Sequence, residues 1–158
     1  MVHVDAPPAV APLDALYEGQ RDRLLRLAHL LTGSRALAEE IVQEAFVVLC
    51  ADDRPIEHGP AYARGIVVNL ARKAQRRRGV EERHARRTGR DDVVLPPELD
   101  GAWAAVRRLP PDQRAVVVLR FYEDASLQAI ADLLDKPLGT VKSHLHRALK
   151  ALAKELAP

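Results

Sequence analysis

Apolar residues recur every three to four positions through nearly all of this chain, and the two-residue alternation typical of strands is almost absent. This spacing places apolar side chains on one face of a helix, so it predicts an all-α fold. The first two helices, over about 13–31 and 34–51, should form a hairpin. Gly33 is the expected stop of the first helix, and Ser34 is the expected N-cap of the second.

The second predicted helix has an apolar face and an acidic face. Its inward positions are Ala38, Ile41, Val42, Ala45, Phe46 and Leu49. Its outward positions are Glu39, Glu40, Gln43 and Glu44, with Val47 at the boundary. The apolar face should pack in the core, and the acidic face should meet solvent or a partner. Cys50, the single cysteine, follows the apolar pattern and is expected to be a buried thiol without a disulfide.

A loop rich in proline and glycine is expected over 52–60, followed by a third helix over about 61–78 that ends at Gly79. The inward residues of this helix should be Ile66, Val67 and Leu70. Its outward side is strongly basic, and the residues available to solvent or to DNA are Arg64, Asn69, Arg72, Lys73, Arg76, Arg77 and Arg78.

The composition divides the chain into two small helical domains joined by a flexible charged linker. We expect a disordered tail over 1–12, a first domain over 13–78, the linker over 79–97 and a second domain over 98–158. The linker is assigned because this stretch is charged, contains glycine and proline, and has too few apolar residues to build a core. A second domain of this size buries a modest core, so it should move relative to the first.

The second domain should contain four helices, the first two over 99–109 and 111–122, with Pro111 in a first helical turn. A helix-turn-helix over 126–153 completes it. The first helix of that hairpin begins at Ser126, stops at the Asp135-Lys136-Pro137 sequence, and buries Leu127, Ile130, Leu133 and Leu134. Gly139 lies where the turn meets the second helix.

The last helix separates apolar from basic residues. One arc holds Val141, Leu145, Ala148, Leu149 and Leu152. The other holds Lys142, Ser143, His146, Arg147 and Lys150. A helix of this kind can enter the major groove of DNA, although a hairpin with a merely solvated basic face would show the same pattern. His144 and His146 cannot share a metal ion, because residues two apart on a helix diverge by about 200°, and no metal site is expected.

Charge is segregated along the chain although the overall net charge is only +2. Residues 1–60 hold 5 basic and 10 acidic side chains, a net charge of −5. Residues 61–90 hold 10 basic and 2 acidic side chains, a net charge of +8. Residues 91–158 hold 9 and 10, a net charge of −1. An acidic first third and a basic middle suggest two different partners, one of them polyanionic.

Three blocks, taken in order, resemble a bacterial sigma factor of the extracytoplasmic-function type. Residues 36–46 read ALAEEIVQEAF, residues 61–78 read AYARGIVVNLARKAQRRR, and residues 109–152 carry the helix-turn-helix. They are similar, in that order, to the family's segments for core polymerase, for the minus-ten promoter element and for the minus-thirty-five element. The resemblance implies a protein that binds core RNA polymerase and directs promoter-specific transcription initiation.

The resemblance also implies site residues. Those matching the contact with the clamp of the largest polymerase subunit are Glu40, Gln43, Glu44 and Val47. Those matching the minus-ten contact are Tyr62, Asn69, Arg72, Lys73, Arg76 and Arg77, with the loop 52–60 forming part of a pocket for a flipped base. This chain lacks the tryptophan that many relatives carry near Tyr62, which could instead be a core residue. Those matching the minus-thirty-five contact are Thr140, Lys142, Ser143, His146 and Arg147, with His144 peripheral.

No combination of residues typical of an enzyme is present, so we expect a non-enzymatic factor that needs no cofactor and no metal. The expected partners are core polymerase, through its clamp and flap, and promoter DNA, with an anti-sigma factor as a candidate regulator. The absence of a long apolar run predicts a cytoplasmic protein without membrane insertion. Two alternatives stay open, namely a stand-alone helix-turn-helix regulator and an interaction protein that does not contact DNA.

Overall fold

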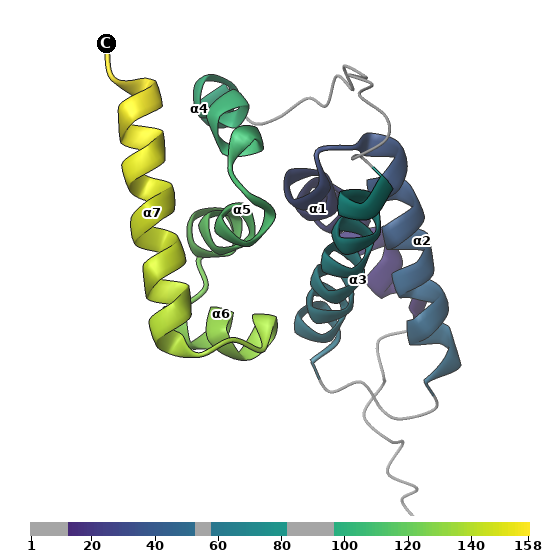
Figure 1. The fold of residues 1–158 in the computed structure, drawn as a ribbon. Coiled ribbons are helices and arrows are strands. Elements are labelled where there is room, and N and C mark those ends of the chain that lie inside the picture. The colour runs from purple at the N-terminus through teal and green to yellow at the C-terminus, as the bar shows by residue number, and fades with distance from the viewer. Residues whose placement is uncertain (1–12, 53–57, 82–96) are drawn as a thin grey trace, which may run out of the picture.

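The computed structural model of the chain describes residues 13–52, 58–81 and 97–158. Regular structure within these ranges is entirely helical, as the spacing of apolar residues predicts. The elements are α1 (Leu13–Thr32), α2 (Arg35–Ala51), α3 (Gly59–Glu81), α4 (Pro97–Arg108), α5 (Pro111–Val117), the π-helix η1 (Val118–Tyr122), α6 (Leu127–Leu134) and α7 (Leu138–Leu156). Figure 1 shows α1, α2 and α3 in one group and α4 to α7 in a second group beside it. The predicted tail 1–12 and most of the predicted linker, 82–96, lie outside the described residues.

A tight turn at Gly33 and Ser34 joins α1 to α2. Gly33 has a φ of 72°, a left-handed conformation that glycine adopts without the steric cost of a Cβ atom, and its N–H donates to His29 O at 2.7 Å. The Ser34 hydroxyl accepts a hydrogen bond of 3.3 Å from the N–H of Leu37, which caps α2. Both the predicted stop and the predicted cap are confirmed.

Helix α2 divides into two faces as its periodicity predicts. All six predicted inward residues are buried, and the predicted outward residues are exposed. The buried face packs against α1 and α3, and the Phe46 ring meets the Tyr17 ring edge-on with centroids 4.7 Å apart. Each large apolar side chain buried in this way contributes about 1.5–3 kcal/mol, so the core of the first group fixes which side of α2 remains free.

Helix α3 is longer than predicted. It begins at Gly59 and continues to Glu81, so the prediction that Gly79 ends the helix is wrong. A helical glycine costs only about 1 kcal/mol relative to alanine, and it ends a helix reliably only where it adopts a left-handed conformation. Val67 is buried and Ile66 and Leu70 are half-buried, as predicted. The periodicity also left unassigned three further buried residues, Ala63, Val68 and Ala71.

The predicted helix over 111–122 is divided in two. Pro111 occupies the first turn of α5, as predicted, but the last turn widens into η1, where the N–H of Glu123 reaches Val118 O at 3.3 Å. A π-turn of this kind inserts a residue and changes which side the following side chains face. Phe121, within this turn, is 63% exposed, whereas Glu123, directly after it, is buried.

Helices α6 and α7 form the predicted helix-turn-helix. The hydroxyl of Ser126 accepts a hydrogen bond of 3.1 Å from the N–H of Ala129 and caps α6. Helix α6 ends where Asp135 adopts a left-handed conformation with a φ of 51°, and Pro137 then precedes the first turn of α7. Ile130 and Leu134 are buried, whereas Leu127 and Leu133 are half-buried. The hairpin therefore packs through the predicted face.

Two burial predictions fail. Leu149 was expected in the apolar arc of α7, but it is 42% exposed, because this helix is buried mainly at Val141 and Ala148. Cys50 was expected to be a buried thiol, but it is exposed, because it lies seven residues after Gln43 and three after Val47 and so shares their outward face of α2. The adjacent Leu49 is buried, so the face of the helix and not its end decides the exposure of Cys50.

The two groups of helices share one apolar core. It contains Leu31 and Val67 from the first group and Val116 and Ile130 from the second. Helix α3 contacts α6, and α1 contacts both α5 and η1. The sequence predicts a second domain that moves relative to the first, and in this structure the second domain is packed against the first.

Candidate polymerase and nucleic-acid interfaces

The basic face of α7 lies opposite its buried face. Lys142, Ser143, His146 and Arg147 are exposed, and Thr140, in the first turn, is half-buried. Val141 and Ala148 anchor the other side of the helix in the core. This leaves the donors of the predicted minus-thirty-five residues free to reach a polyanion, while the contact with DNA itself stays a prediction.

A second basic surface follows α3. Asn69, Lys73, Arg76 and Arg77 are all exposed, so the helix presents a row of cations to solvent. The remaining two predicted minus-ten residues, Tyr62 and Arg72, make hydrogen bonds within the chain. The Tyr62 hydroxyl donates a hydrogen bond of 3.0 Å to Asp52 Oδ2, and its side chain is 38% exposed rather than in the core.

Arg72 is set apart from the other cations of α3. Its guanidinium donates a hydrogen bond of 2.8 Å to the main-chain oxygen of Leu134 in α6, and the residue is half-buried. It therefore points into the contact between the two groups of helices. The sequence predicts a phosphate contact at Arg72, and in this arrangement the side chain serves a contact within the chain.

The predicted polymerase-binding residues lie together on the exposed face of α2. Glu40, Gln43 and Glu44 are exposed, and the side chain of Val47 is 66% exposed. Val48, which the sequence does not single out, is also 41% exposed. An acidic helix face with two exposed valines at one end offers both charge and apolar area to a protein partner.

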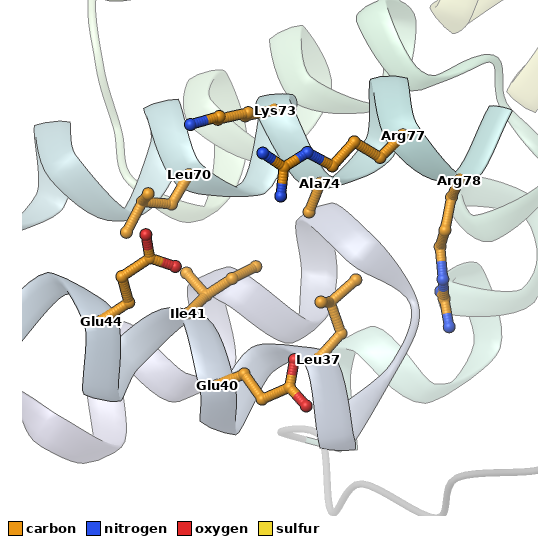
Figure 2. A pocket seen from close by; sticks show the side chains of 9 residues that line it. All are labelled: Leu37, Glu40, Ile41, Glu44, Leu70, Lys73, Ala74, Arg77 and Arg78. Carbon is orange, nitrogen blue, oxygen red and sulfur yellow. The ribbon is translucent and has the colours of Figure 1, made fainter. Parts of the chain in front are cut away.

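A groove between α2 and α3 lies between the acidic face of α2 and the basic face of α3. Figure 2 shows Glu40 and Glu44 on the α2 side and Lys73 and Arg77 on the α3 side. The apolar residues that line it are Leu37, Ile41, Leu70 and Ala74. The carboxylates on α2 therefore lie in the field of the cations on α3. The sequence does not predict this juxtaposition, because the residues come from separate helices.

Glu123 is a buried charged residue that the sequence does not identify. Its side chain is 1% exposed, and one oxygen meets both Arg23 of α1 and Arg64 of α3. The adjacent Tyr122 has a raised pKa, because burial disfavours its charged form more than nearby Arg26 favours it. No sequence pattern could reveal this cluster, since its members lie 100 and 59 positions apart.

Within the described ranges, no three side chains of histidine, cysteine, aspartate or glutamate converge as metal ligands. His144 is half-buried and His146 is exposed, so the two histidines occupy different environments on α7. None of the helices described is both long enough and apolar enough to cross a bilayer.

Two family models match this chain. The model described as sigma-70 region 2 matches residues 16–80, and the model described as sigma-70 region 4 matches residues 100–152. The first match contains the exposed faces of α2 and α3, and the second contains the helix-turn-helix. The matched ranges therefore include all three surfaces described above.

Curated proteins of known family are similar over most of the chain. The RNA polymerase sigma-E factor of Streptomyces coelicolor is 33% identical over 144 residues, which cover 87% of this chain and 81% of that protein. The ECF RNA polymerase sigma factor SigE of Mycolicibacterium smegmatis is 32% identical over 165 aligned positions, which cover 94% of this chain and 63% of the relative.

Two solved structures share the fold. The extracytoplasmic function sigma factor SigJ of Mycobacterium tuberculosis superposes with a TM-score of 0.67 at 27% identity, covering 87% of this chain and 52% of that one. The sigma factor RpoE of Bartonella quintana, solved in complex with the anti-sigma factor NepR, has a TM-score of 0.67 at 22% identity, covering 90% and 99%. Together with the curated relatives and the matches to regions 2 and 4, these likenesses show that the chain belongs to the extracytoplasmic-function family of RNA polymerase sigma factors.

Proposed function

We propose that this sigma factor recruits core RNA polymerase through α2 and reads two promoter elements with α3 and α7. The observation that carries the proposal is that one acidic and two basic helix faces, each within a block that resembles a sigma-factor segment, are exposed on separate helices. Faces of opposite charge suit partners of opposite kind, a protein and a nucleic acid. The family directs transcription initiation at promoters, which requires both partners at once.

Polymerase binding is assigned to Glu40, Gln43, Glu44 and Val47. Their exposure on one side of α2 supports this assignment, as does the family's use of the matching segment against the clamp of the largest subunit. The exposed Val48 extends the apolar part of this surface. In such an interface the buried apolar surface of the valine contributes affinity, and the neighbouring charges fix the orientation of the partner.

Recognition of the minus-ten element is assigned to Tyr62 and Asn69, together with the cations of α3. Lys73, Arg76 and Arg77 are exposed and can hold phosphates, which fixes register without reading sequence. Arg72 is assigned to the same set, and in this structure its guanidinium donates a hydrogen bond to Leu134 O. The loop assigned to the flipped base falls largely on residues 53–57, outside the described part of the chain.

Recognition of the minus-thirty-five element is assigned to α7. Lys142, His146 and Arg147 can reach base edges or phosphates from the exposed face, while Ser143 and Thr140 add hydroxyl donors near the start of the helix. A basic side chain that contacts a guanine edge contributes about 1–3 kcal/mol of discrimination. The same domain is the candidate contact for the polymerase flap.

The family consists of transcription initiation factors, and we propose that this member has no enzymatic activity, needs no cofactor and acts in the cytoplasm with polymerase. Regulation by an anti-sigma factor is a further proposal, supported by the RpoE relative that was solved with NepR.

A gel-shift experiment on duplex promoter DNA tests the proposal. The chain alone should shift the DNA weakly, and the chain together with core polymerase should shift it tightly. Tight, sequence-specific binding without polymerase would instead favour a stand-alone helix-turn-helix regulator. No binding to promoter DNA under either condition would favour an interaction protein that does not contact DNA.

A further inference from the structure

A side-chain hydrogen bond joins the end of α2 to the start of α3. The Tyr62 hydroxyl donates to Asp52 Oδ2 at 3.0 Å, and Figure 1 shows these two helix ends on the same side of the first group. Asp52 is the C-cap of α2, and Tyr62 lies in the first turn of α3. The hydrogen bond thus links two helices across ten positions of sequence.

The main chain is also held on both sides of this hydrogen bond. The N–H of Asp52 donates to Leu49 O at 3.3 Å, and the N–H of Tyr62 donates to His58 O at 2.9 Å. A tyrosine ring that is anchored only at its Cα can change its direction by rotation about the first side-chain torsion. That rotation would break the hydrogen bond to Asp52. The bond therefore fixes the direction in which the ring of Tyr62 projects from α3.

The ring held in this way keeps an accessible surface. Tyr62 is 38% exposed, and it begins a row of exposed residues that continues along α3 at Asn69, Lys73 and Arg76. Asn69 and Lys73, seven and eleven positions after Tyr62, return to within about 20° of its direction, so the row follows one side of the helix. An aromatic surface in line with cations suits single-stranded nucleic acid, whose bases stack and whose phosphates are anionic.

The charge of Asp52 does not by itself favour DNA. A carboxylate repels the phosphates of a nearby strand, so an acidic residue beside the start of this row opposes binding unless it has another role. Orienting the ring of Tyr62 is such a role. A side chain that is ordered before binding loses less conformational entropy when a base stacks on it.

We propose that Asp52 is a positioning residue, whose carboxylate holds the Tyr62 ring in one direction as a stacking surface for an unpaired base of the promoter. All four bases have an aromatic face, so Asp52 should affect affinity for the opened strand rather than the choice of sequence. The stacking role rests on the proposed function, in which Tyr62 serves the minus-ten element. Because Asp52 acts through the hydroxyl of Tyr62, the effects of the two residues should be coupled.

Fluorine NMR of the full chain labelled with 3-fluorotyrosine tests whether Asp52 holds the ring. The chain has three tyrosines, and Tyr62→Phe identifies the resonance of Tyr62 by its loss. Asp52→Ala should shift this resonance, because the ring then samples several rotamers, whereas Asp52→Asn keeps an oxygen acceptor and should restore most of the wild-type position. Asp14→Ala, at an exposed position of α1, is the matched control. A resonance of Tyr62 unchanged by Asp52→Ala would overturn the inference.

Binding of polymerase-bound chain to fork-junction DNA tests the use of the ring. The probe is a promoter that gives chain-dependent run-off, with its minus-ten segment single-stranded, together with a series that carries an abasic site at each unpaired position in turn. Asp52→Ala should weaken binding to the intact probe about two- to tenfold, as expected for one hydrogen bond. At the position of the stacked base, the abasic probe should bind wild type and Asp52→Ala equally. Loss of the charge alone would instead tighten binding to every probe.

Tyr62→Phe keeps the ring and removes only the hydroxyl, so it should lose as much affinity as Asp52→Ala, and the double variant should lose no more than either. Additive losses would overturn the inference, as would equal or tighter binding of Asp52→Ala to the intact probe. Absence of chain-dependent binding with wild type would contradict the proposed function and the stacking role together. The fluorine spectrum would then still decide whether Asp52 fixes the ring.

Discussion

Arg72 of α3 donates a hydrogen bond of 2.8 Å to the main-chain oxygen of Leu134 in α6. The same arginine is one of the residues predicted to contact the minus-ten element, and here its guanidinium is engaged within the chain. Among the six predicted minus-ten residues, Arg72 and Tyr62 alone have side-chain hydrogen bonds described within the chain. Arg72 therefore differs from Lys73, Arg76 and Arg77, which are exposed on the same helix.

The acidic face of α2 should be the main determinant of polymerase affinity. The double variant Gln43→Ala, Glu44→Arg reverses a charge on an exposed helix face without touching the core. Affinity for core polymerase in a pull-down titration should fall about tenfold or more, as expected for central residues of a charged interface. Glu18→Arg, an equally exposed change on α1, serves as the control and should bind like wild type. An affinity for the double variant equal to that of wild type would remove this surface from the account.

Arg147 should contribute to promoter choice. Arg147→Ala removes an exposed guanidinium from the basic face of α7 and should reduce transcription about 5- to 150-fold from promoters that depend on the minus-thirty-five element, corresponding to about 1–3 kcal/mol. Promoters without that element should respond little. Lys154→Ala, near the end of the same helix, should leave both unchanged. Equal output from wild type and Arg147→Ala on both promoter types would count against the assignment.

The cations of α3 should act through phosphates rather than through bases. Arg76→Ala should weaken binding of polymerase-bound chain to fork-junction DNA by a similar factor for different sequences. It should also lower the slope of log affinity against log salt by about 1, because one phosphate contact is lost. Titrations at several salt concentrations measure both effects, with Arg21→Ala as the control. A loss confined to one DNA sequence would indicate that Arg76 reads a base.

The cap of α6 should stabilise the helix-turn-helix. Ser126→Ala removes the acceptor for the N–H of Ala129 and should lower the free energy of unfolding by about 1 kcal/mol. Urea denaturation measures this difference. Ser143→Ala, at an exposed position inside α7, should change stability much less. An equal loss in the free energy of unfolding for both variants would show that the Ser126 cap does not stabilise the helix-turn-helix specifically.

The spacing of residues along the chain predicts the local features of a helix, namely its buried face and its ends. The buried residues of α2, the Gly33 turn and the Ser34 and Ser126 caps follow from local spacing, and all are confirmed. Periodicity fails where the outcome depends on contacts made elsewhere. Leu149 is exposed because α7 is buried mainly at Val141 and Ala148, and Gly79 continues α3 because a glycine alone is a weak stop.

The candidate surfaces were predictable for a related reason. An exposed charged face, such as that of Lys142 and Arg147, can be seen in the order of residues along one helix. The partners of Glu123 cannot, because Arg23 and Arg64 reach it from two other helices. The π-turn before Glu123, which changes the direction of its side chain, has no sequence signal of its own either. Sequence thus indicates which residues face outward, and the structure adds which of them already have a partner within the chain.

Run-off transcription with purified core polymerase over a randomised promoter library tests the central claim most directly. With the chain present, transcripts should start downstream of paired minus-ten and minus-thirty-five elements that are enriched together in the sequenced templates. Core polymerase without the chain should show no such enrichment. Absence of chain-dependent, promoter-specific transcripts, with folded protein and active polymerase, would contradict the account.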